Sequence, residues 1–326
     1  MTKLKRRPAV VRLLLAIAIL AALLLGLVVW VSLPYIKEDL PDEDPDHLHL
    51  HTEPMSELTE APPAFVAPPT ETAPTQPETL PEPQTESTEP DPEDLIPRPE
   101  TNPYGRGDFQ FDGRYLKSTS CDSLAGVDVS AYQGDVNWNQ VAVSGIEFAM
   151  IRVGYRGYGS GKLVEDAYAR ENLRDALHAG LEVGVYFFSQ ALNEEEVEEE
   201  IAFILDIIRD YNITMPVVFD WEYISAEART ADMDARTLTD LNLYFCQRME
   251  EEGYTPMIYF NSYQAKNLLF LYELEDYPFW LAYYSYHMRY PYRVDMWQYT
   301  CTGRVPGIQG NVDINVLLLD NKLKPE

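Results

Sequence analysis

The sequence predicts an α/β protein built on an irregular (β/α) barrel of the TIM-like type, preceded by a transmembrane helix and a disordered stalk. Three observations predict this fold class. Short β-branched and aromatic runs alternate with helical patterns in the C-terminal part, an uncharged apolar stretch lies near the start, and an acidic, proline-rich stretch separates the two. The expected parts are a basic cytoplasmic tail over 1–12, a membrane segment over 13–33, a stalk over 34–120 and a folded barrel over 121–326.

The membrane segment is expected because residues 13–33 contain no charge and are rich in Leu, Ala, Ile and Val. As a helix this stretch is roughly 31 Å long, about the hydrocarbon thickness of a bilayer. Five basic residues and no acidic residue occur in 1–35, and Glu38 and Asp39 follow, so we expect a cytoplasmic N-terminus and an extracellular remainder. A cleaved secretory signal is the alternative. The apolar run exceeds the usual length of about 7–15 residues and no small-x-small site follows it, which favours an uncleaved signal anchor.

The stretch after the membrane segment has the composition of a disordered chain. Residues 36–103 hold 16 prolines and 18 acidic residues against two basic residues, and they contain no glycine. Apolar residues are too few there to offset the entropy of ordering the chain, and proline and like charges keep it extended. We expect a spacer that reaches roughly 45 Å as a coil and about 210 Å when fully extended.

Charge and cysteine content exclude several classes of protein. The chain has 326 residues, of which 53 are acidic and 25 are basic, and its net charge is −28. A nucleic-acid-binding protein needs a basic face for the phosphates, so no nucleic-acid partner is expected. Three cysteines provide neither a disulfide framework nor a zinc spacing. Cys121 and Cys301 flank predicted strands, which leaves a disulfide between them open, and Cys246 is expected to be buried and free.

The barrel is expected from eight strand-like runs and the helical patterns between them. Continuous apolar strands separated by helices indicate a mainly parallel sheet covered by helices. The last three strands are too close in sequence for a full helix between each, so we expect an irregular barrel. Strands are predicted over 124–131, 147–155, 181–189, 215–223, 255–261, 278–285, 294–299 and 311–318, and helices over 165–179, 193–210 and 234–252.

Acidic residues mark strand ends, where a TIM-like barrel carries its chemistry. Asp220 and Glu222 lie two residues apart at the end of one strand, so both are expected to point into the barrel mouth. Asp128 and Asp313 lie in two other apolar runs, where an acid is costly to bury unless it is paired or functional. Two adjacent carboxylates suit a general acid beside a charge that stabilises a cation, which is the demand of glycoside cleavage. Pairing with an arginine and an all-carboxylate Mg²⁺ or Ca²⁺ site are the alternatives.

Aromatic residues at the same strand ends predict a sugar-binding cleft. The apolar faces of sugars stack on aromatic rings, and a tyrosine hydroxyl adds a polar contact. Tyr186, Tyr259 and Trp280 are the preferred cleft residues because each lies near the end of its strand. The expected substrate-binding set is completed by Tyr155, Tyr283 and Gln298.

Seven short pieces of the predicted barrel follow one another in a characteristic order. They are Gly126-Val127-Asp128-Val129-Ser130 with Tyr132-Gln133-Gly134, Phe148-Ala149-Met150-Ile151-Arg152, Gly184-Val185-Tyr186-Phe187-Phe188, Asp220-Trp221-Glu222, Trp280-Leu281-Ala282-Tyr283, Trp297-Gln298-Tyr299 and Val312-Asp313-Ile314-Asn315. Through these pieces, residues from about 124 to 320 resemble glycoside hydrolase family 25, the muramidases also called Chalaropsis-type lysozymes. Every acidic position of the family's pattern is filled.

The resemblance implies a β-1,4-N-acetylmuramidase that cuts the glycan strands of peptidoglycan after N-acetylmuramic acid. It makes Glu222 the proton donor to the leaving oxygen. It makes Asp220 the charged partner, acting on the oxocarbenium-like centre or through the substrate's own N-acetyl group. Asp128 and Asp313 correspond to the family's two further cleft carboxylates, and no cofactor is implied.

Anchor, stalk and barrel together predict a cell-wall hydrolase held in the cell membrane by residues 13–33, with its catalytic domain facing the wall. Two other functions stay open. One is a non-catalytic peptidoglycan-binding or scaffold domain on the same barrel, although a binder has little reason to keep a repelling pair such as Asp220 and Glu222. The other is a chitinase-like hydrolase of N-acetyl sugars.

Overall fold

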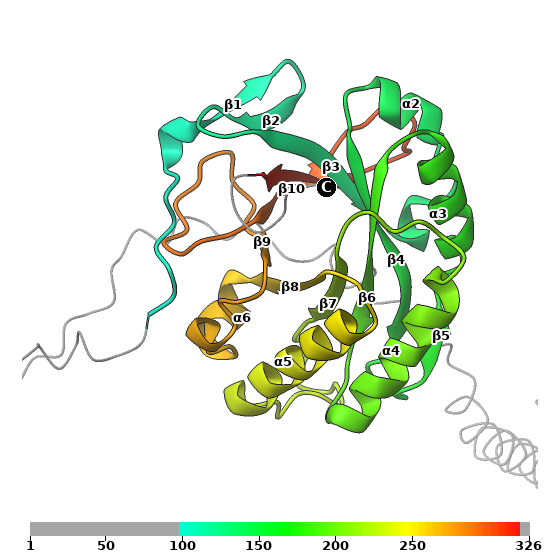
Figure 1. Cartoon of the computed structure of the whole chain (residues 1–326), viewed down its shortest axis with the longest axis vertical. Helices are drawn as coiled ribbons and strands as arrows, with labels where there is room; N and C mark the ends of the chain where they lie inside the picture. Colours follow the sequence, from blue (N-terminus) through cyan, green and yellow to red (C-terminus); the bar gives the residue numbers. More distant parts are fainter. Residues whose placement is uncertain (1–97, 320–326) are drawn as a thin grey trace, which may run out of the picture. The chain divides into compact units, whose positions relative to one another are not determined.

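The computed structural model describes residues 98–319, and within them eight strands close into a barrel with helices packed around it (Figure 1). The barrel strands are β3 (Ser123–Val129), β4 (Phe148–Arg156), β6 (Glu182–Ser189), β7 (Val217–Trp221), β8 (Pro256–Asn261), β9 (Phe279–Ala282), β10 (Met296–Gly303) and β11 (Val312–Leu318). Their order is β3-β11-β10-β9-β8-β7-β6-β4, and pairing between β3 and β4 closes the barrel. A short strand, β5 (Leu163–Glu165), pairs antiparallel with β4. All eight predicted strands are therefore confirmed.

Helices follow the strands from β3 to β8, and the two longest begin at side chains that cap them. In α4 (Glu194–Ile208) the Asn193 side chain accepts the Glu196 N–H, and three glutamates in the first turn complement the helix dipole. In α5 (Ala235–Glu251) the Asp234 side chain accepts two backbone N–H groups. These two helices and α3 (Ala169–His178) confirm the predicted ones. The short helices α2 (Trp138–Val143) and α6 (Ser262–Asn267) were not expected from the sequence.

The last part of the barrel departs from the strand–helix repeat, as expected. The connection from β9 to β10, residues 283–295, contains no helix, and neither does the connection from β10 to β11 over 304–311. β11 runs antiparallel to both of its neighbours, whereas the other barrel strands are parallel. The N-terminal end of β11 therefore meets the C-terminal ends of the other strands at the same end of the barrel.

Residues 98–120 belong to the folded part, which corrects the C-terminal end of the predicted stalk (34–120). They contain a hairpin of β1 (Phe109–Asp112) and β2 (Tyr115–Ser118), in which Phe109, Tyr115 and Leu116 are buried. The Phe109 ring packs edge-on against Trp297, with ring centroids 5.1 Å apart. Aromatic and leucine side chains return after residue 103, so this segment has apolar surface to bury, unlike the proline-rich stretch before it.

Three of the predicted parts lie outside the described residues: the tail over 1–12, the membrane segment over 13–33 and the stalk up to residue 97. Across residues 98–319, no helix has both the length and the apolar character that crossing a bilayer requires.

All three cysteines lie within the described part of the chain and all are free. The alternative of a disulfide between Cys121 and Cys301 is therefore not borne out. Cys246 is buried in α5, as the sequence predicts, and burial raises the pKa of its thiol well above the usual value.

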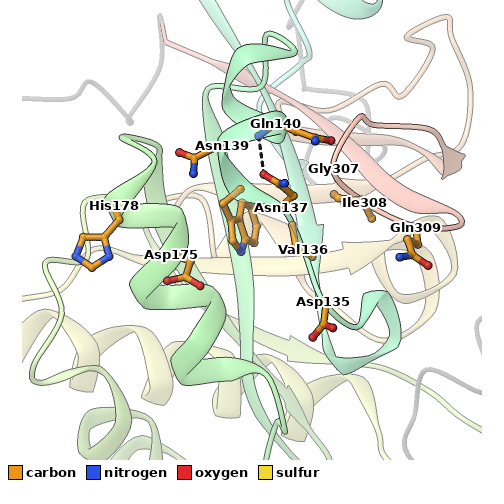
Figure 2. Close-up of a pocket in the computed structure, with 11 residues that line it drawn as sticks. Asp135, Val136, Asn137, Asn139, Gln140, Asp175, His178, Gly307, Ile308 and Gln309 are labelled. Carbon is orange, nitrogen blue, oxygen red and sulfur yellow. Dashed lines mark hydrogen bonds between the residues drawn. The ribbon is translucent and has the colours of Figure 1, made fainter.

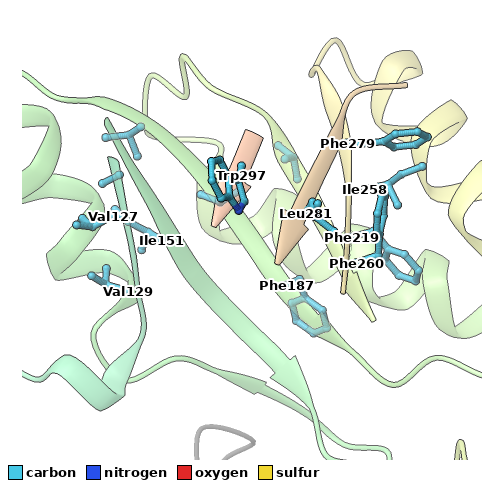
Figure 3. Packing of buried hydrophobic residues seen from close by; sticks show 14 of the residues in the cluster. Val127, Val129, Ile151, Phe187, Phe219, Ile258, Phe260, Phe279, Leu281 and Trp297 are labelled. Atoms are coloured by element: carbon cyan, nitrogen blue, oxygen red, sulfur yellow. The ribbon is translucent and has the colours of Figure 1, made fainter. Parts of the chain in front are cut away.

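Two apolar clusters lie on opposite faces of the barrel strands. The outer one joins the strands to the helices, and Figure 3 shows part of it, including Phe219, Ile258 and Phe279. The inner one contains Val218, which alternates along β7 with Val217 and Phe219 of the outer cluster. It fills the barrel with Phe148, Met150, Tyr186, Met215, Val218, Met257, Tyr259, Trp280, Ala282, Met296 and Leu317. Asp220 shares the inner face with Val218, so the alternation directs its carboxylate into the barrel mouth.

Candidate active site

Four carboxylates lie at the end of the barrel where β3 and β7 end and β11 begins. Asp128 is the next-to-last residue of β3, and the sheet register pairs it with Asp313 near the start of β11. Asp220 is the next-to-last residue of β7, and Glu222 directly follows that strand. Asp128, Asp220 and Glu222 are each less than one tenth exposed, and Asp313 is half-buried. Residues from three separate stretches of sequence thus meet, as the spacing argument predicts.

The charges of these carboxylates affect the pKa values of two tyrosine side chains, Tyr259 and Tyr284. Burial raises the pKa of Tyr259 well above its ordinary value, and the negative charges of Glu222, Asp220 and Asp128 add to the shift. Burial also raises the pKa of Tyr284, with contributions from the charges of Asp313, Glu222 and Asp128. The Tyr284 side chain is still 38% exposed, so it stands at the rim of the group rather than inside it. Each of the four carboxylates therefore contributes to the electrostatic environment of at least one of these two phenols.

Asp128 is held by two amides that are themselves held by aromatic side chains. Its Oδ2 atom accepts hydrogen bonds from Gln298 Nε2 at 3.0 Å and from Asn315 Nδ2 at 2.8 Å. The Asn315 oxygen in turn accepts the Trp280 indole N–H at 2.8 Å. The Gln298 oxygen accepts the Tyr259 hydroxyl at 3.4 Å. Each amide thus has its oxygen engaged and its NH₂ group directed at Asp128, an arrangement suited to an ionised, acceptor-only carboxylate.

The end of β7 is fixed by side chains from the neighbouring strand ends on both sides. Gln190, directly after β6, donates its Nε2 to the Glu222 carbonyl at 2.8 Å. Gln264 of α6, which follows β8, donates to the Trp221 carbonyl. The Trp221 indole donates to the Ala191 carbonyl at 3.3 Å. The backbone that carries Asp220 and Glu222 is therefore set by amide contacts to both adjacent strands.

Gln190 also ties the loop after β7 to the strand end. Its side-chain oxygen accepts the Thr230 hydroxyl at 2.6 Å, and its carbonyl accepts Arg229 Nη1 at 2.8 Å. Arg229 is further paired with Glu196 of α4, with nitrogen–oxygen distances of 2.8 and 2.5 Å. A buried amide and an ion pair thus hold the chain on the C-terminal side of Glu222.

The predicted sugar-binding residues divide into two groups. Tyr186 and Tyr259 lie inside the barrel beside Trp280, with ring centroids 6.0 and 5.0 Å from the indole. Trp280 is 1% exposed, so its expected stacking on a sugar is wrong: its ring fills the barrel, and its N–H orients Asn315. Gln298 is likewise buried and orients Asp128.

The other two predictions fall at the edges of the site. Tyr283 directly follows β9, where it packs against the outer cluster and its carbonyl accepts the Trp297 indole N–H at 2.7 Å. Its expected place in the cleft is therefore corrected, because Trp280 and Ala282 of β9 belong to the inner cluster and the next residue, Tyr283, falls on the opposite face. Tyr155 is buried at the end of β4 with the Arg152 guanidinium 5.3 Å from its ring centre.

The rings that are exposed at the barrel mouth come from the loops after the strands. Tyr223 follows β7 and Tyr263 follows β8, and their ring centroids are 6.0 Å apart. The half-exposed rings that follow barrel strands are Tyr132, Tyr223, Tyr263, Tyr284 and Tyr286. Sequence reasoning missed Tyr284 and Asn315, although counting in steps of two from Trp280 and from Asp313 reaches both.

A hollow on the outside of the barrel is separate from this site. It has a volume of about 590 Å³ and lies between α2, the end of α3 and the loop at 307–309 (Figure 2). Its lining includes Trp138, Asp175 and His178 but none of the four site carboxylates. Across the described part of the chain, no three His, Cys, Asp or Glu side chains are grouped so that they could hold a metal ion.

Known proteins resemble this chain in sequence. The model of the family "Glycosyl hydrolases family 25" matches residues 127–308. Lysozyme M1 of Streptomyces globisporus is 26% identical over 225 residues, which cover 63% of this chain and 71% of that protein. The uncharacterized protein YegX of Escherichia coli K12 is 27% identical over 204 residues, which cover 60% of this chain and 69% of YegX.

Solved structures show the same fold. The modular autolysin LytC of Streptococcus pneumoniae, in complex with a synthetic peptidoglycan ligand, aligns with a TM-score of 0.54 at 23% identity over 64% of this chain. This chain spans about half the length of LytC, 51%. A family 25 glycosyl hydrolase from Bacillus anthracis aligns with a TM-score of 0.52 at 20% identity, over 66% of this chain and 96% of that one. Because the family model matches more than half of its residues, this chain belongs to glycosyl hydrolase family 25 and is a glycoside hydrolase.

Proposed function

We propose that this glycoside hydrolase is an N-acetylmuramidase, which hydrolyses the β-1,4 bond between N-acetylmuramic acid and N-acetylglucosamine in peptidoglycan. The observation that carries the proposal is the pair Asp220 and Glu222 at the end of β7, facing Asp128 and Asp313 across the barrel mouth. The likeness to a lysozyme and to an autolysin solved with a peptidoglycan ligand supports the choice of substrate.

In the proposed reaction Glu222 donates its proton to the glycosidic oxygen as the bond from that oxygen to C1 of muramic acid breaks. Because two neighbouring like charges are disfavoured, one carboxyl of the pair, Glu222, keeps its proton while Asp220 is ionised. Asp220 then stabilises the positive charge at C1 directly or through the substrate's N-acetyl oxygen. Water then adds its hydroxide to C1 and returns a proton to Glu222. General-acid help of this kind contributes roughly 10²–10⁴-fold to the rate.

Asp128 and Asp313 are proposed to position the sugar and to set the electrostatic field around Glu222. The two amide N–H groups that donate to Oδ2 fix the orientation in which the Asp128 carboxylate meets the sugar. Since Gln298 and Asn315 are both buried, this carboxylate is positioned before substrate arrives.

We further propose that the enzyme acts outside the cell from a membrane tether. The uncharged stretch 13–33, the basic residues before it and the acidic residues after it support a single-pass anchor with its N-terminus in the cytoplasm. The proline-rich acidic stretch supports a spacer that lifts the barrel toward the wall.

The activity is tested with the purified full-length protein and its Glu222→Gln and Glu227→Gln variants, each incubated with purified peptidoglycan. Glu227 is an exposed carboxylate in the loop after β7 and serves as the matched control. Products are reduced with borohydride and analysed by mass spectrometry, which identifies the sugar at each new reducing end. We expect reduced muramic acid ends from the parent and from Glu227→Gln, and at least a ~100-fold loss of them with Glu222→Gln.

Other results would replace the proposal. Reduced glucosamine ends would mean that the other glycosidic bond is cut, and cleavage of chitin oligomers in preference to peptidoglycan would indicate a chitinase-like enzyme. No cleavage, with the protein still retained on peptidoglycan, would indicate a binding module.

The tether is tested by fractionation of cells that express the full chain. We expect the protein to stay in the membrane pellet after alkaline carbonate extraction, and protease added to wall-stripped cells to remove the barrel. Release of a shortened chain that begins after residue 33 into the medium would show a cleaved signal instead.

A further inference from the structure

Two exposed rings, Phe111 of the β1–β2 hairpin and Tyr286 of the β9–β10 loop, touch each other beside the barrel mouth. Their centroids are 5.3 Å apart with the ring planes at 65°, and the two side chains are 49% and 50% exposed. A single exposed ring is unremarkable, but a contacting pair presents a continuous apolar surface to solvent. Tyr286 was described above only as one of the half-exposed rings at the barrel mouth, and Phe111 has no place in that site.

The pair rests on buried groups that fix its position. The Tyr286 ring packs against Tyr299 at 6.0 Å, and Tyr299 is buried, with its hydroxyl accepting the Leu116 N–H at 3.3 Å. Phe111 lies on the same face of β1 as Phe109, which is packed against Trp297. Both rings are therefore held in place before any ligand binds, which lowers the entropic cost of binding.

Tyr286 lies close in sequence to Tyr284, which stands at the rim of the carboxylate site. Tyr286 is two residues after Tyr284, whose phenol is affected by the charges of Asp313, Glu222 and Asp128. Two residues span at most about 7 Å of backbone, a length comparable to one sugar unit. The path from Tyr284 to the exposed rings is therefore short enough for a glycan strand of several sugar units to span.

We propose that Phe111 and Tyr286 form an accessory subsite, which stacks on a sugar ring of the bound glycan strand outside the units that flank the cleaved bond. The inference rests on the proposed function for its substrate. Sugar rings present apolar C–H faces that suit aromatic side chains with solvent at their edges. Two rings offer far less than the ~800 Å² per partner that a stable protein interface requires, which favours a glycan over a protein as the occupant. Phe111 also lies outside the residues matched by the family model, 127–308.

The test compares long and short glycans rather than overall activity. The full-length protein and its Phe111→Ala, Tyr286→Ala, Phe111→Leu and Phe111→Tyr variants are assayed on peptide-free glycan chains of two and of six or more disaccharide units. The measured quantity is the ratio of kcat/KM on the long chains to kcat/KM on the short ones. Tyr272→Ala is the matched control, because Tyr272 is an exposed ring in the 3-10 turn Leu271–Glu273, away from the hairpin.

The two alanine variants are expected to lower the ratio roughly 2- to 10-fold, mainly through KM on the long chains. Phe111→Leu should lower it as well, because an apolar side chain without a ring cannot stack, whereas Phe111→Tyr and Tyr272→Ala should keep the parent ratio. An unchanged ratio in Phe111→Ala, or equal ratios for leucine and tyrosine at 111, would overturn the subsite. So would a change of Phe111→Ala from dimer to monomer in light scattering, which would make the pair a contact between copies.

Failure of the proposed function is distinguishable from failure of the subsite. If the parent cleaves none of the glycans, the muramidase proposal fails, and the subsite is then measured by titrating long and short glycans into the parent and Phe111→Ala. Weaker binding of the long glycan alone would support the subsite, and equal binding would overturn it.

Discussion

From β3 to β8 each strand is followed by a helix that covers the outer face of the sheet, whereas the described residues contain no helix between β9 and β10 or between β10 and β11. In the second region the outer face of β10 is covered by Phe109 and the β1–β2 hairpin, which come from the other end of the folded part. The apolar face of a sheet must be buried against another element, and that element can come from any part of the chain. The region from β9 to β11 is therefore covered in part by residues that lie before the family-matched segment.

The comparison between the two regions is tested most strongly by replacing one buried phenylalanine in each region with alanine. Phe109→Ala is expected to lower the free energy of unfolding by about 3–5 kcal/mol, because it leaves a cavity against Trp297. Phe219→Ala, which removes a ring stacked on Phe245 of α5, should cost a similar amount. Denaturant unfolding measures both, with half-exposed Phe111→Ala as the control. A large loss for Phe219→Ala alone would show that the hairpin does not replace a helix.

The region from β3 to β8 should also make the free energy of unfolding depend on pH, which the region from β9 to β11 should not. Burial raises the pKa of Glu200 in α4 to about 7, against the opposing effects of Arg156 and Ser189. Since its ordinary value is 4.5, the folded protein holds a proton that the unfolded chain has lost between these values. The contribution of this pKa shift to the free energy of unfolding is complete below pH 4.5. It is lost as the pH rises through about 7, which lowers the free energy of unfolding by about 3 kcal/mol.

Glu200→Gln should remove this dependence, so that its unfolding free energy changes less than that of the parent between pH 5 and 8. Glu199→Gln is the control, because the neighbouring Glu199 carboxylate is 61% exposed although it also contacts Arg156. Parallel curves for the parent and Glu200→Gln would assign the pH dependence to another group.

In the region from β3 to β8, Gln190→Met is expected to reduce kcat while changing KM little. It leaves the Glu222 carbonyl and the Thr230 hydroxyl without their buried partner, which costs about 1–3 kcal/mol and releases the strand end that carries the proposed acid. Steady-state kinetics on peptidoglycan fragments measures the effect. Gln309→Met, on the outside of the barrel, should retain the parent kcat, and an unchanged kcat for Gln190→Met would remove Gln190 from any positioning role.

The smallest effect is expected from Trp280→Phe, which changes a residue of β9 in the region without helices. It removes the indole N–H that holds the Asn315 amide toward Asp128, and one neutral hydrogen bond contributes about 1 kcal/mol, or roughly fivefold in kcat/KM. Trp297→Phe removes the corresponding N–H on the outer face and should leave kcat/KM at the parent value. Equal effects of the two substitutions would mean that both act through stability.

The strands of the barrel were predictable because each is a continuous apolar run, and the carboxylates were predictable because an acid in such a run is costly without a purpose. The hairpin was missed because the composition of the long stalk masked a few apolar residues, such as Phe109 and Leu116, at its end. The helices α2 and α6 are six residues each, too short to show a clear helical period.

The supporting contacts of the site differ in how far the sequence could reveal them. Asn315 and Tyr284 follow from the alternation of strand residues, and the same alternation would have excluded Tyr283. Gln190 and Gln264 act on backbone carbonyls 32 and 43 residues away, and nothing in a local pattern records such a contact. The burial of Trp280 depends on the closure of the barrel around it, which is a property of the whole fold.

Residues 100–102 run antiparallel along the β9–β10 loop, through the backbone hydrogen bonds Arg293 N–H to Glu100 O at 2.8 Å and Asn102 N–H to Pro291 O at 2.9 Å and a bridge between Thr101 and Tyr292. The chain therefore enters the folded part beside the loop that carries Tyr284 and Tyr286. Any mechanical pull on the chain before residue 98 is borne first by these bonds and by the ion pair of Glu100 with Arg293. Tension would thus load the rim of the catalytic site before it reaches the rest of the barrel.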